Sequence, residues 1–166
     1  IITTNNLSLF KKLRKLRNLG SEMKFKHELI GLNSRLDTIQ AIILNEKLKK
    51  LTFNNSKRKK IAKFYNQNIT NPKIKKIRYS KSCVFHQYVI LVKNRSKLIK
   101  LFKSRRIEYG LHYPFAIHQL NALKNKFKKK KFENAERIAK EGISIPIDPN
   151  LTKKNINYII RTLNSF

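Results

Sequence analysis

The segment Gly31-Leu32-Asn33-Ser34-Arg35-Leu36-Asp37-Thr38-Ile39-Gln40-Ala41 places polar side chains directly ahead of a stretch with helical apolar spacing. Asn33 and Ser34 are residue types that cap helices, because their side-chain oxygens accept hydrogen bonds from the free backbone N–H groups of the first turn. The positive end of the helix dipole then favours a negatively charged ligand such as phosphate. We therefore predict a helix that begins at Ser34, with polar groups at its start that suit an anion.

Four stretches of the chain have apolar residues at helical spacing: residues 7–19, 34–71, 95–106 and 152–163. Gly20 is expected to end the first helix, because glycine adopts the backbone conformation that follows a helix C-terminus. The polar patch at 54–60 is expected to bend or interrupt the long second segment. Thr152 is a plausible N-cap of the last helix, whose buried stripe is expected to be Ile156, Ile159, Ile160 and Leu163.

Other stretches have the composition of β-strands: residues 75–79, 84–92, 107–111 and 143–147. The second reads VFHQYVILV and is rich in β-branched and aromatic residues, which favour strands. Strands separated by helices predict an α/β or α+β fold. A chain of 166 residues with 40% hydrophobic content is long enough to bury one core, as one domain or as a piece of a larger protein.

The chain carries a net charge of +30, and such a charge often indicates a partner rich in phosphate groups. The composition suggests another origin: 29 Lys, 18 Asn and 21 Ile make up much of the chain, and their codons can be written with A and T alone. This explanation leaves the low number of acids, 9, unaccounted for. The lysine-rich run at 124–131 fits either a phosphate-binding patch or a solvated, mobile loop, and such dense like charge favours the loop.

The single cysteine excludes an internal disulfide framework and fits a reducing compartment. No apolar run is long enough to span a bilayer, and residues 1–6 do not begin a secretory signal, so we expect a cytoplasmic chain without membrane contact. Cys83 and His86 are three positions apart, which places them on opposite faces of a strand. No second pair has zinc-ligand spacing, so no metal site is predicted.

The four glycines are too far apart in the sequence to form the GxGxxG or GxxxxGK[ST] loops that hold nucleotide phosphates. The GxSxG motif of serine hydrolases is absent as well. One cluster of residues that could take part in catalysis or binding remains, at residues 109–114, with His118 shortly after it. Its glycine and proline shape a turn, which would set the imidazole of His112 beside the phenol of Tyr113 after a strand. A purely structural turn explains the same residues equally well.

Five blocks in this order resemble the C-terminal half of the DegT/DnrJ/StrS-type sugar aminotransferases. The blocks are IITTNNLSLFKKLRKLRNLG, GLNSRLDTIQAIIL, VFHQYVILVKNR, RRIEYGLHYPFAIH and AERIAKEGISIPIDPNLTKKNINYII. The resemblance implies a type I aminotransferase fold, in which residues 1–33 end the large cofactor domain and residues 34–71 form a long connecting helical segment. Residues 72–166 would form the small C-terminal domain, a short, mostly antiparallel sheet packed with helices. It also implies a homodimer with shared active sites.

Site residues follow from the same resemblance. Asn33 matches the family asparagine that reaches the cofactor phosphate of the neighbouring subunit, and Arg35 matches an arginine near that site that meets the sugar nucleotide or supports the loop. His112 and Tyr113 match the His-Tyr-Pro segment on the substrate side. His86 lies in the family's strand motif and is expected to be structural.

The resemblance implies an enzyme that uses pyridoxal 5'-phosphate to move an amino group from an amino acid, usually glutamate, to a nucleotide-linked keto-sugar, in amino-sugar or surface polysaccharide synthesis. In the family, the lysine that forms the Schiff base precedes the first matching block, so no catalytic residue is assigned to this chain. We expect a C-terminal fragment that is inactive by itself. Two alternatives stay open, a basic nucleic-acid-binding module and an inactive truncated relic.

Overall fold

A computed structural model describes residues 1–123, 125–127 and 130–166 of the chain. The lysine-rich run at 124–131 therefore lies partly outside the described residues. The chain forms two compact units, residues 1–50 and 51–166. Helices alternate with two small antiparallel sheets, as the predicted mixed fold class requires. The predicted division at residues 33 and 71 concerns the domains of a complete enzyme and stays a prediction.

The first unit contains the helix α1 (Leu7–Leu16), the strands β1 (Ser21–Met23) and β2 (Lys26–His27), and the helix α2 (Thr38–Lys49). Asn6 caps α1 by accepting a hydrogen bond from the Leu9 N–H at 3.0 Å. The prediction that this helix reaches residue 19 is wrong, because Leu19 and Gly20 have positive φ angles of 58° and 78°. Helical geometry cannot continue through such residues.

The predicted start of the second helix is also wrong. Helix α2 begins at Thr38, with Asp37 in the N-cap position. Asn33 and Ser34 instead lie in an extended segment that pairs with the residues following α1: Asn33 bridges Asn18, and the Ser34 N–H donates to Arg17 O at 2.9 Å. These backbone hydrogen bonds hold the segment in an extended form, so neither side chain caps the helix.

Lys50 separates α2 from the helix α3 (Leu51–Asn68), which opens the second unit. The interruption expected within residues 54–60 therefore comes earlier, and this polar patch lies inside α3. Polar side chains are compatible with a helix that is held by a few apolar residues, and α3 buries Ile61, Ala62 and Tyr65 further along.

The sheet of the second unit has the order β3-β4-β5, with β3 (Ile74–Lys76), β4 (Tyr88–Val92) and β5 (Gly142–Ile145) all antiparallel to their neighbours. These strands confirm three of the predicted ones, although they are shorter. The fourth expected strand, at 107–111, joins the sheet only through a bridge between Gly110 and Ser144.

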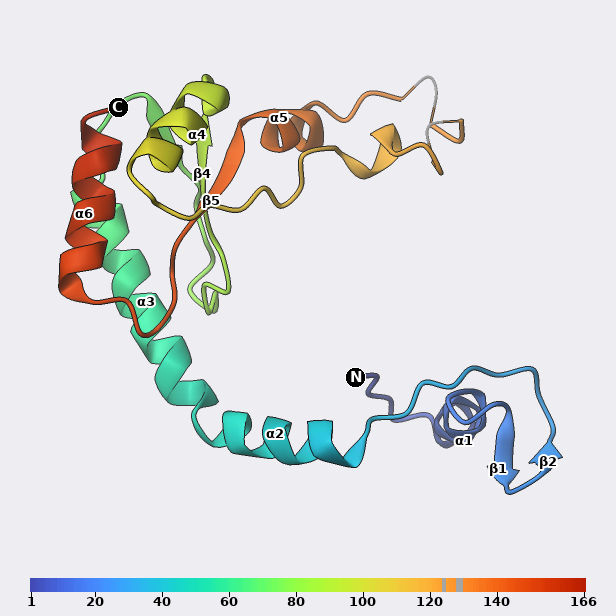
Figure 1. Cartoon of the computed structure of the whole chain (residues 1–166). Helices are drawn as coiled ribbons and strands as arrows, with labels where there is room; N and C mark the ends of the chain where they lie inside the picture. Colours follow the sequence, from blue (N-terminus) through green and yellow to red (C-terminus); the bar gives the residue numbers. More distant parts are fainter. Residues whose placement is uncertain (124, 128–129) are drawn as a thin grey trace. The chain divides into compact units, whose positions relative to one another are not determined.

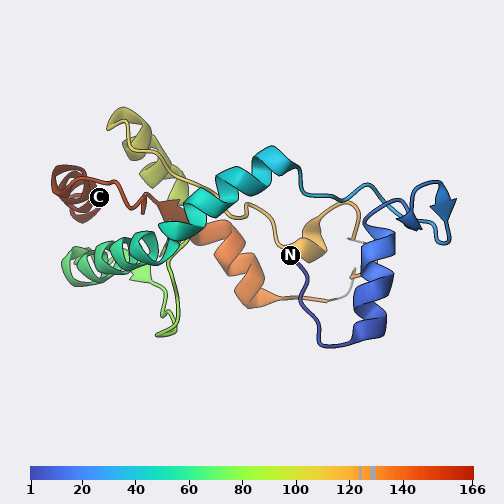
Figure 2. The same ribbon diagram turned by 90° about the horizontal axis from the view of Figure 1, so that it is seen from below.

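Helices lie on both sides of this sheet. Besides α3, they are α4 (Arg95–Ser104), α5 (Glu133–Glu141) and α6 (Lys153–Asn164). A short 3-10 turn, η1 (Ile117–Gln119), lies between α4 and α5 in the sequence. α3 and α6 lie side by side on one side of the sheet, and α5 lies on the other (Figures 1 and 2). Thr152 caps α6 as predicted, accepting from the Asn155 N–H at 3.2 Å, and the expected stripe of α6 is buried.

Large aromatic and aliphatic side chains fill the core of the second unit. Tyr65 from α3, Tyr88 from β4 and Phe102 from α4 are fully buried and belong to one apolar cluster with the α6 stripe. The hydroxyl of Tyr65 donates to Pro146 O at 2.8 Å, and that of Tyr88 donates to Asn66 Oδ1 at 2.6 Å. Each buried phenol thus keeps a partner, as buried polar groups require. Within the described residues, no helix is long and apolar enough to cross a bilayer.

Candidate functional site

Asn33 and Arg35 form a polar pair in the first unit. The Arg35 Nε donates to Asn33 Oδ1 at 3.1 Å, and both residues are exposed. This bond uses the amide oxygen of Asn33, which leaves its NH₂ group and the remaining N–H groups of Arg35 as donors. Amide and guanidinium donors on adjacent side chains suit a phosphate or carboxylate, which accepts several hydrogen bonds at once.

The start of α2 is less suited to an anion than the sequence indicated. Asp37 occupies the N-cap without a side-chain capping bond. Its carboxylate therefore lies where the helix dipole would otherwise attract an anionic ligand, and it repels such a ligand. An anion near this segment is therefore better placed at the Asn33–Arg35 pair than at the helix start.

His112 and Tyr113 lie together in the second unit, with ring centroids 5.8 Å apart in an edge-on arrangement. The His112 Nδ1 is 3.0 Å from the Ser144 Oγ of β5. Gly110 lies against the same ring, because a Cβ at this position would stand 2.2 Å from His112 Cε1. A serine and a glycine thus contact the imidazole, while His112 and Tyr113 both remain exposed.

The rigidity of this arrangement comes from the sheet. Ser144 exchanges two backbone hydrogen bonds with Gly110, of 2.8 and 3.0 Å, and faces Val89 of β4 on its other side. Side chains alternate along a strand. Ile143 and Ile145 belong to the core, so the Ser144 side chain is directed to the opposite face, where His112 binds it.

A hollow of about 470 Å³ opens beside His112. It is lined by charged and polar side chains, namely Arg58, His86, Gln87, Glu108, His112, Ser144 and Asp148, and by the Tyr109–Gly110 and Ile145–Ile147 segments. Carboxylates, an amide and a guanidinium together offer both acceptors and donors, which suits a ligand rich in hydroxyl groups.

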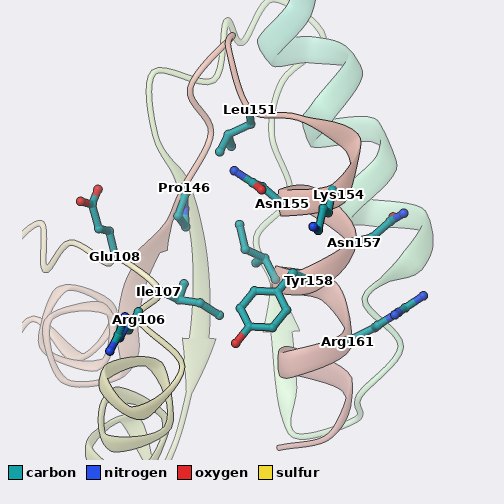
Figure 3. Close-up of a pocket in the computed structure, with 11 residues that line it drawn as sticks. Arg106, Ile107, Glu108, Pro146, Leu151, Lys154, Asn155, Asn157, Tyr158 and Arg161 are labelled. Atoms are coloured by element: carbon teal, nitrogen blue, oxygen red, sulfur yellow. The ribbon is translucent and has the colours of Figure 1, made fainter.

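A second hollow, of about 640 Å³, lies between the segment after α4 and helix α6 (Figure 3). Ile107, Pro146 and Leu151 form apolar walls, and the ring of Tyr158 lies across it. The Tyr158 hydroxyl donates to Arg105 O at 3.2 Å, which ties α6 to the end of α4. None of the predicted site residues lines this hollow.

The remaining predicted candidates have separate surroundings. His86 lines the hollow beside His112, and its expected structural role stays a prediction. The His118 Nε2 pairs with Glu136 Oε1 at 3.0 Å. The pKa of Glu136 is held below its ordinary value, mainly by the hydrogen bond from the backbone N–H of Phe132 and to a smaller extent by His118. Among the described residues, no group of three or more His, Cys, Asp or Glu side chains could hold a metal ion.

The sequence pattern predicted His112 as a site residue and Gly110 as a turn residue, but it did not predict the contact of His112 with Ser144, nor the places of Arg58 and Asp148 in the hollow. One signal was visible: Ser144 is a polar residue between two isoleucines of a predicted strand, which assigns it to the face away from the core. Arg58 and Asp148 are 90 positions apart in the sequence, and only the fold brings them to one hollow.

Residues 1–164 match the model of the DegT/DnrJ/EryC1/StrS aminotransferase family. The chain belongs to this family, which confirms the resemblance found in its sequence. It is 34% identical over 167 residues to the dTDP-3-amino-3,6-dideoxy-alpha-D-galactopyranose transaminase of Aneurinibacillus thermoaerophilus, covering 99% of this chain and 46% of the relative. It is 31% identical to the dTDP-3-amino-3,4,6-trideoxy-alpha-D-glucose transaminase of Streptomyces venezuelae, covering 92% of this chain and 41% of that relative.

Solved structures agree in fold. DesV of S. venezuelae superposes with a TM-score of 0.89 at 29% identity, covering 98% of this chain and 45% of DesV. Helicobacter pylori PseC, an aminotransferase of pseudoaminic acid biosynthesis, gives a TM-score of 0.85 at 25% identity, covering 98% of this chain and 47% of PseC. The chain thus spans about half the length of the relatives it matches, and the predicted fold class is confirmed.

Proposed function

We propose that this chain is the C-terminal portion of a pyridoxal-phosphate-dependent aminotransferase that transfers an amino group from an amino acid to a nucleotide-linked keto-sugar. The observation that carries the proposal is the family match over residues 1–164, together with relatives that act as transaminases of nucleotide-linked sugars. The complete enzyme would be a homodimer and would act in amino-sugar or surface polysaccharide synthesis, as the sequence resemblance implies.

The residues present fit one part of the cofactor, its phosphate. Asn33 and Arg35 are exposed, adjacent and rich in donors, and such a pair can bind two phosphate oxygens while the guanidinium neutralises charge. When bound, pyridoxal phosphate supplies the electron sink and carries the nitrogen during transfer. In our proposal Asn33 holds the phosphate, and Arg35 orients the Asn33 amide through its 3.1 Å bond and contacts the phosphate or the sugar nucleotide.

The described lysines do not fit the covalent role. A lysine that bonds to the cofactor must be held against it and stripped of water so that its amine becomes nucleophilic. The described lysines are exposed, apart from Lys15 and Lys57, which are half-buried. Lys15 binds Glu28 at 2.5 Å, an interaction that raises its pKa and keeps it protonated. The described lysines therefore do not supply the reactive amine, and our proposal assigns that role to another part of the complete enzyme.

The hollow beside His112 would take the sugar. Hydroxyl groups of a sugar both donate and accept hydrogen bonds, and the hollow provides acceptors in Glu108 and Asp148 and donors in Arg58. Two carboxylates make the same hollow unfavourable for a phosphate, so the sugar ring fits it better than the nucleotide's phosphates do. His112 lines the hollow, and the ring of Tyr113 lies 5.8 Å from that of His112. In our proposal both residues contact the sugar.

Helix α2 supports an assembly larger than this chain. No residue of α2 is buried, and its large apolar side chains are all exposed: Ile39, Ile42, Ile43, Leu44 and Leu48. An apolar surface that continues around a helix is typical of a helix buried by other parts of a protein. A second subunit or a preceding domain would cover it.

Fusing the chain behind the N-terminal half of a related sugar aminotransferase tests the proposal. The fusion is expected to transfer an amino group from glutamate to a dTDP-linked keto-sugar when supplied with pyridoxal phosphate, whereas the chain alone is expected to give no turnover. Failure of a folded, cofactor-loaded fusion with several nucleotide-linked keto-sugars would contradict the proposal.

Asn33 is tested in the same fusion. Replacing Asn33 by Asp puts a negative charge beside the phosphate, which costs on the order of 4 kcal/mol at about 4 Å and an effective dielectric of about 20. Asn33→Ala loses only about 1 to 3 kcal/mol, the contribution of a hydrogen bond to a charged group. Cofactor titration should therefore rank the affinities as wild type, Ala, then Asp. Equal affinities would show that Asn33 does not contact the cofactor.

A mixed dimer sharpens the Asn33 test. If Asn33 reaches the neighbouring subunit, a dimer with one Asn33→Asp subunit should lose cofactor affinity at the site of its unmutated partner. Damage in the mutant's own site would contradict the cross-subunit contact while leaving the transferase proposal intact.

A further inference from the structure

The hydroxyl proton of Ser144 has one acceptor within reach in the described part of the chain, the His112 Nδ1 at 3.0 Å. Ser144 lines the hollow but is only 7% exposed, so few solvent positions remain for its hydroxyl. A buried hydroxyl that donates to nothing is unfavourable, because it loses the hydrogen bond that it makes to water in the unfolded chain. If Nδ1 carried the imidazole proton, the Ser144 Oγ would accept the hydrogen bond from Nδ1–H. The O–H of Ser144 would then have no acceptor among the described residues.

We propose that Ser144 is a positioning residue that donates its hydroxyl proton to His112 Nδ1 and so fixes the imidazole proton on Nε2. Neutral imidazole carries one proton, and the bond made at one nitrogen decides which nitrogen holds it. With Nδ1 acting as acceptor, Nε2 is an N–H donor, and no hydrogen bond within the described residues engages it.

Gly110 completes the positioning. A side chain there would overlap the imidazole, with Cβ 2.2 Å from Cε1 and 2.9 Å from Nδ1. The pair of backbone hydrogen bonds between Gly110 and Ser144 keeps the ring's support and its hydrogen-bond partner in fixed register. The imidazole therefore has one orientation in which Nδ1 meets Ser144 and its ring lies over Gly110.

A fixed Nε2–H donor at the rim of the hollow selects a ligand group that accepts a hydrogen bond. This step rests on the proposed function: the group is a carbonyl or hydroxyl oxygen of the sugar, which His112 would orient. An ammonium or another pure donor at this position would be disfavoured, because two donors cannot pair.

Nitrogen-15 NMR of the histidine rings tests the assignment on the chain itself, without cofactor or substrate. At about pH 8.5 an ordinary histidine, with a pKa of about 6.5, is neutral. His112 is identified by the signals that disappear in His112→Asn. We expect the proton of His112 to reside mainly on Nε2 in the wild type.

Three substitutions of Ser144 separate the hydrogen bond from packing. Ser144→Ala removes the hydroxyl, Ser144→Cys keeps the volume with a weak donor, and Ser144→Thr keeps the hydroxyl. Ala and Cys should each lower the Nε2–H to Nδ1–H ratio roughly fivefold, the ratio that a net hydrogen bond of ~1 kcal/mol sets. Thr should restore the wild-type ratio, and unchanged His118 signals serve as the folding control. If Ser144→Ala does not fold, Cys against Thr decides.

A wild-type proton on Nδ1, or the same ratio in the Cys and Thr variants, would overturn the positioning role. Either result leaves the proposed function standing, since the ratio is read without turnover. Conversely, an inactive fusion with the expected tautomer would count against the proposed function alone.

Discussion

The two units of the chain differ in how they bury their apolar residues. In residues 51–166 the helices α3, α4 and α6 and the central sheet share one apolar cluster, with several side chains fully buried. In residues 1–50, α1 and α2 expose most of their large apolar side chains. The first unit is instead held by backbone hydrogen bonds, by the Lys15 ion pairs with Glu22 and Glu28, and by the turn at Gly20.

This difference separates two ways in which a family sequence is stabilised. The second unit has the core that a small domain needs, and it contains the His112 hollow. The first unit contains Asn33 and Arg35 but lacks an equivalent core among the described residues, so we expect its stability to depend on surfaces that another part of the enzyme supplies. Because the chain has no tryptophan and its six tyrosines all lie in residues 51–166, tyrosine fluorescence reports on the second unit alone.

The largest expected effect comes from a matched pair of leucines. Leu98 in α4 is 0% exposed, and Leu48 in α2 is 65% exposed. Leu98→Ala should lower the free energy of unfolding by about 2 to 5 kcal/mol, because a buried cavity replaces the side chain. Leu48→Ala should change it by less than about 0.5 kcal/mol. Urea unfolding followed by far-UV circular dichroism, which detects the helices of both units, measures both changes, and a comparable loss for Leu48 would mean that α2 is buried.

A matched pair of glycines gives the next effect. Gly142→Ala brings a Cβ to 2.5 Å from the Ile138 backbone oxygen, and Gly20→Ala brings one to 1.6 Å from Leu29 O at a positive φ. Each change forces backbone to move and should cost more than about 1 kcal/mol locally.

The two glycine variants should differ in what the tyrosines report. Gly142→Ala is expected to shift the fluorescence-detected transition to lower urea, because β5 lies in the core of the second unit. Gly20→Ala should leave that transition in place while limited proteolysis cuts residues 1–50 faster. A Gly20→Ala variant that shifts the tyrosine transition as well would show that the units unfold together.

The buried tyrosines predict a sensitivity to alkaline pH that belongs to the second unit. Burial raises the pKa of Tyr65 and of Tyr88 above the ordinary value of 10.0. The folded chain therefore holds these protons where the unfolded chain has lost them, so the stability they contribute is complete below about pH 10 and is lost as pH rises above it. Stability should fall progressively above that pH.

Tyr65→Phe separates this titration from other alkaline effects. The variant loses the bond to Pro146 O and about 1 kcal/mol at neutral pH. Its stability should then decline less steeply above pH 10 than that of the wild type. Parallel declines in urea midpoint against pH would assign the alkaline sensitivity to other groups.

The smallest expected effect concerns nucleic acid. Residues 1–50 hold 11 Lys and Arg against 4 Asp and Glu, and the remaining residues hold 28 against 5, so positive charge is spread over both units. Binding that comes from charge alone should be weak, indifferent to base sequence, and steeply reduced by salt, since each phosphate contact releases a counterion. Salt-resistant binding to one defined sequence in a fluorescence titration would favour the nucleic-acid-binding alternative instead.

Sequence reasoning succeeded where local signals and burial agree. The α6 stripe and its Thr152 cap were predictable because a helical period and a capping residue coincide there. It failed in the first unit, where pairing across the chain decides the outcome: the bridge from Asn18 to Asn33 holds residues 33 and 34 extended, although their types favour a helix cap. The support of His112 by Ser144 needed the sheet register, which residue spacing alone does not contain.

Amide hydrogen exchange tests the contrast between the units most directly. In the isolated chain, at a concentration where light scattering gives a monomer, the amides of α6 should exchange slowly, near the rate set by global unfolding, and those of α2 should exchange quickly through local opening. In the fusion with a related N-terminal half, α2 should become protected. If α2 is protected as strongly as α6 in the isolated monomer, the first unit is stable by itself and our account of the two units is wrong.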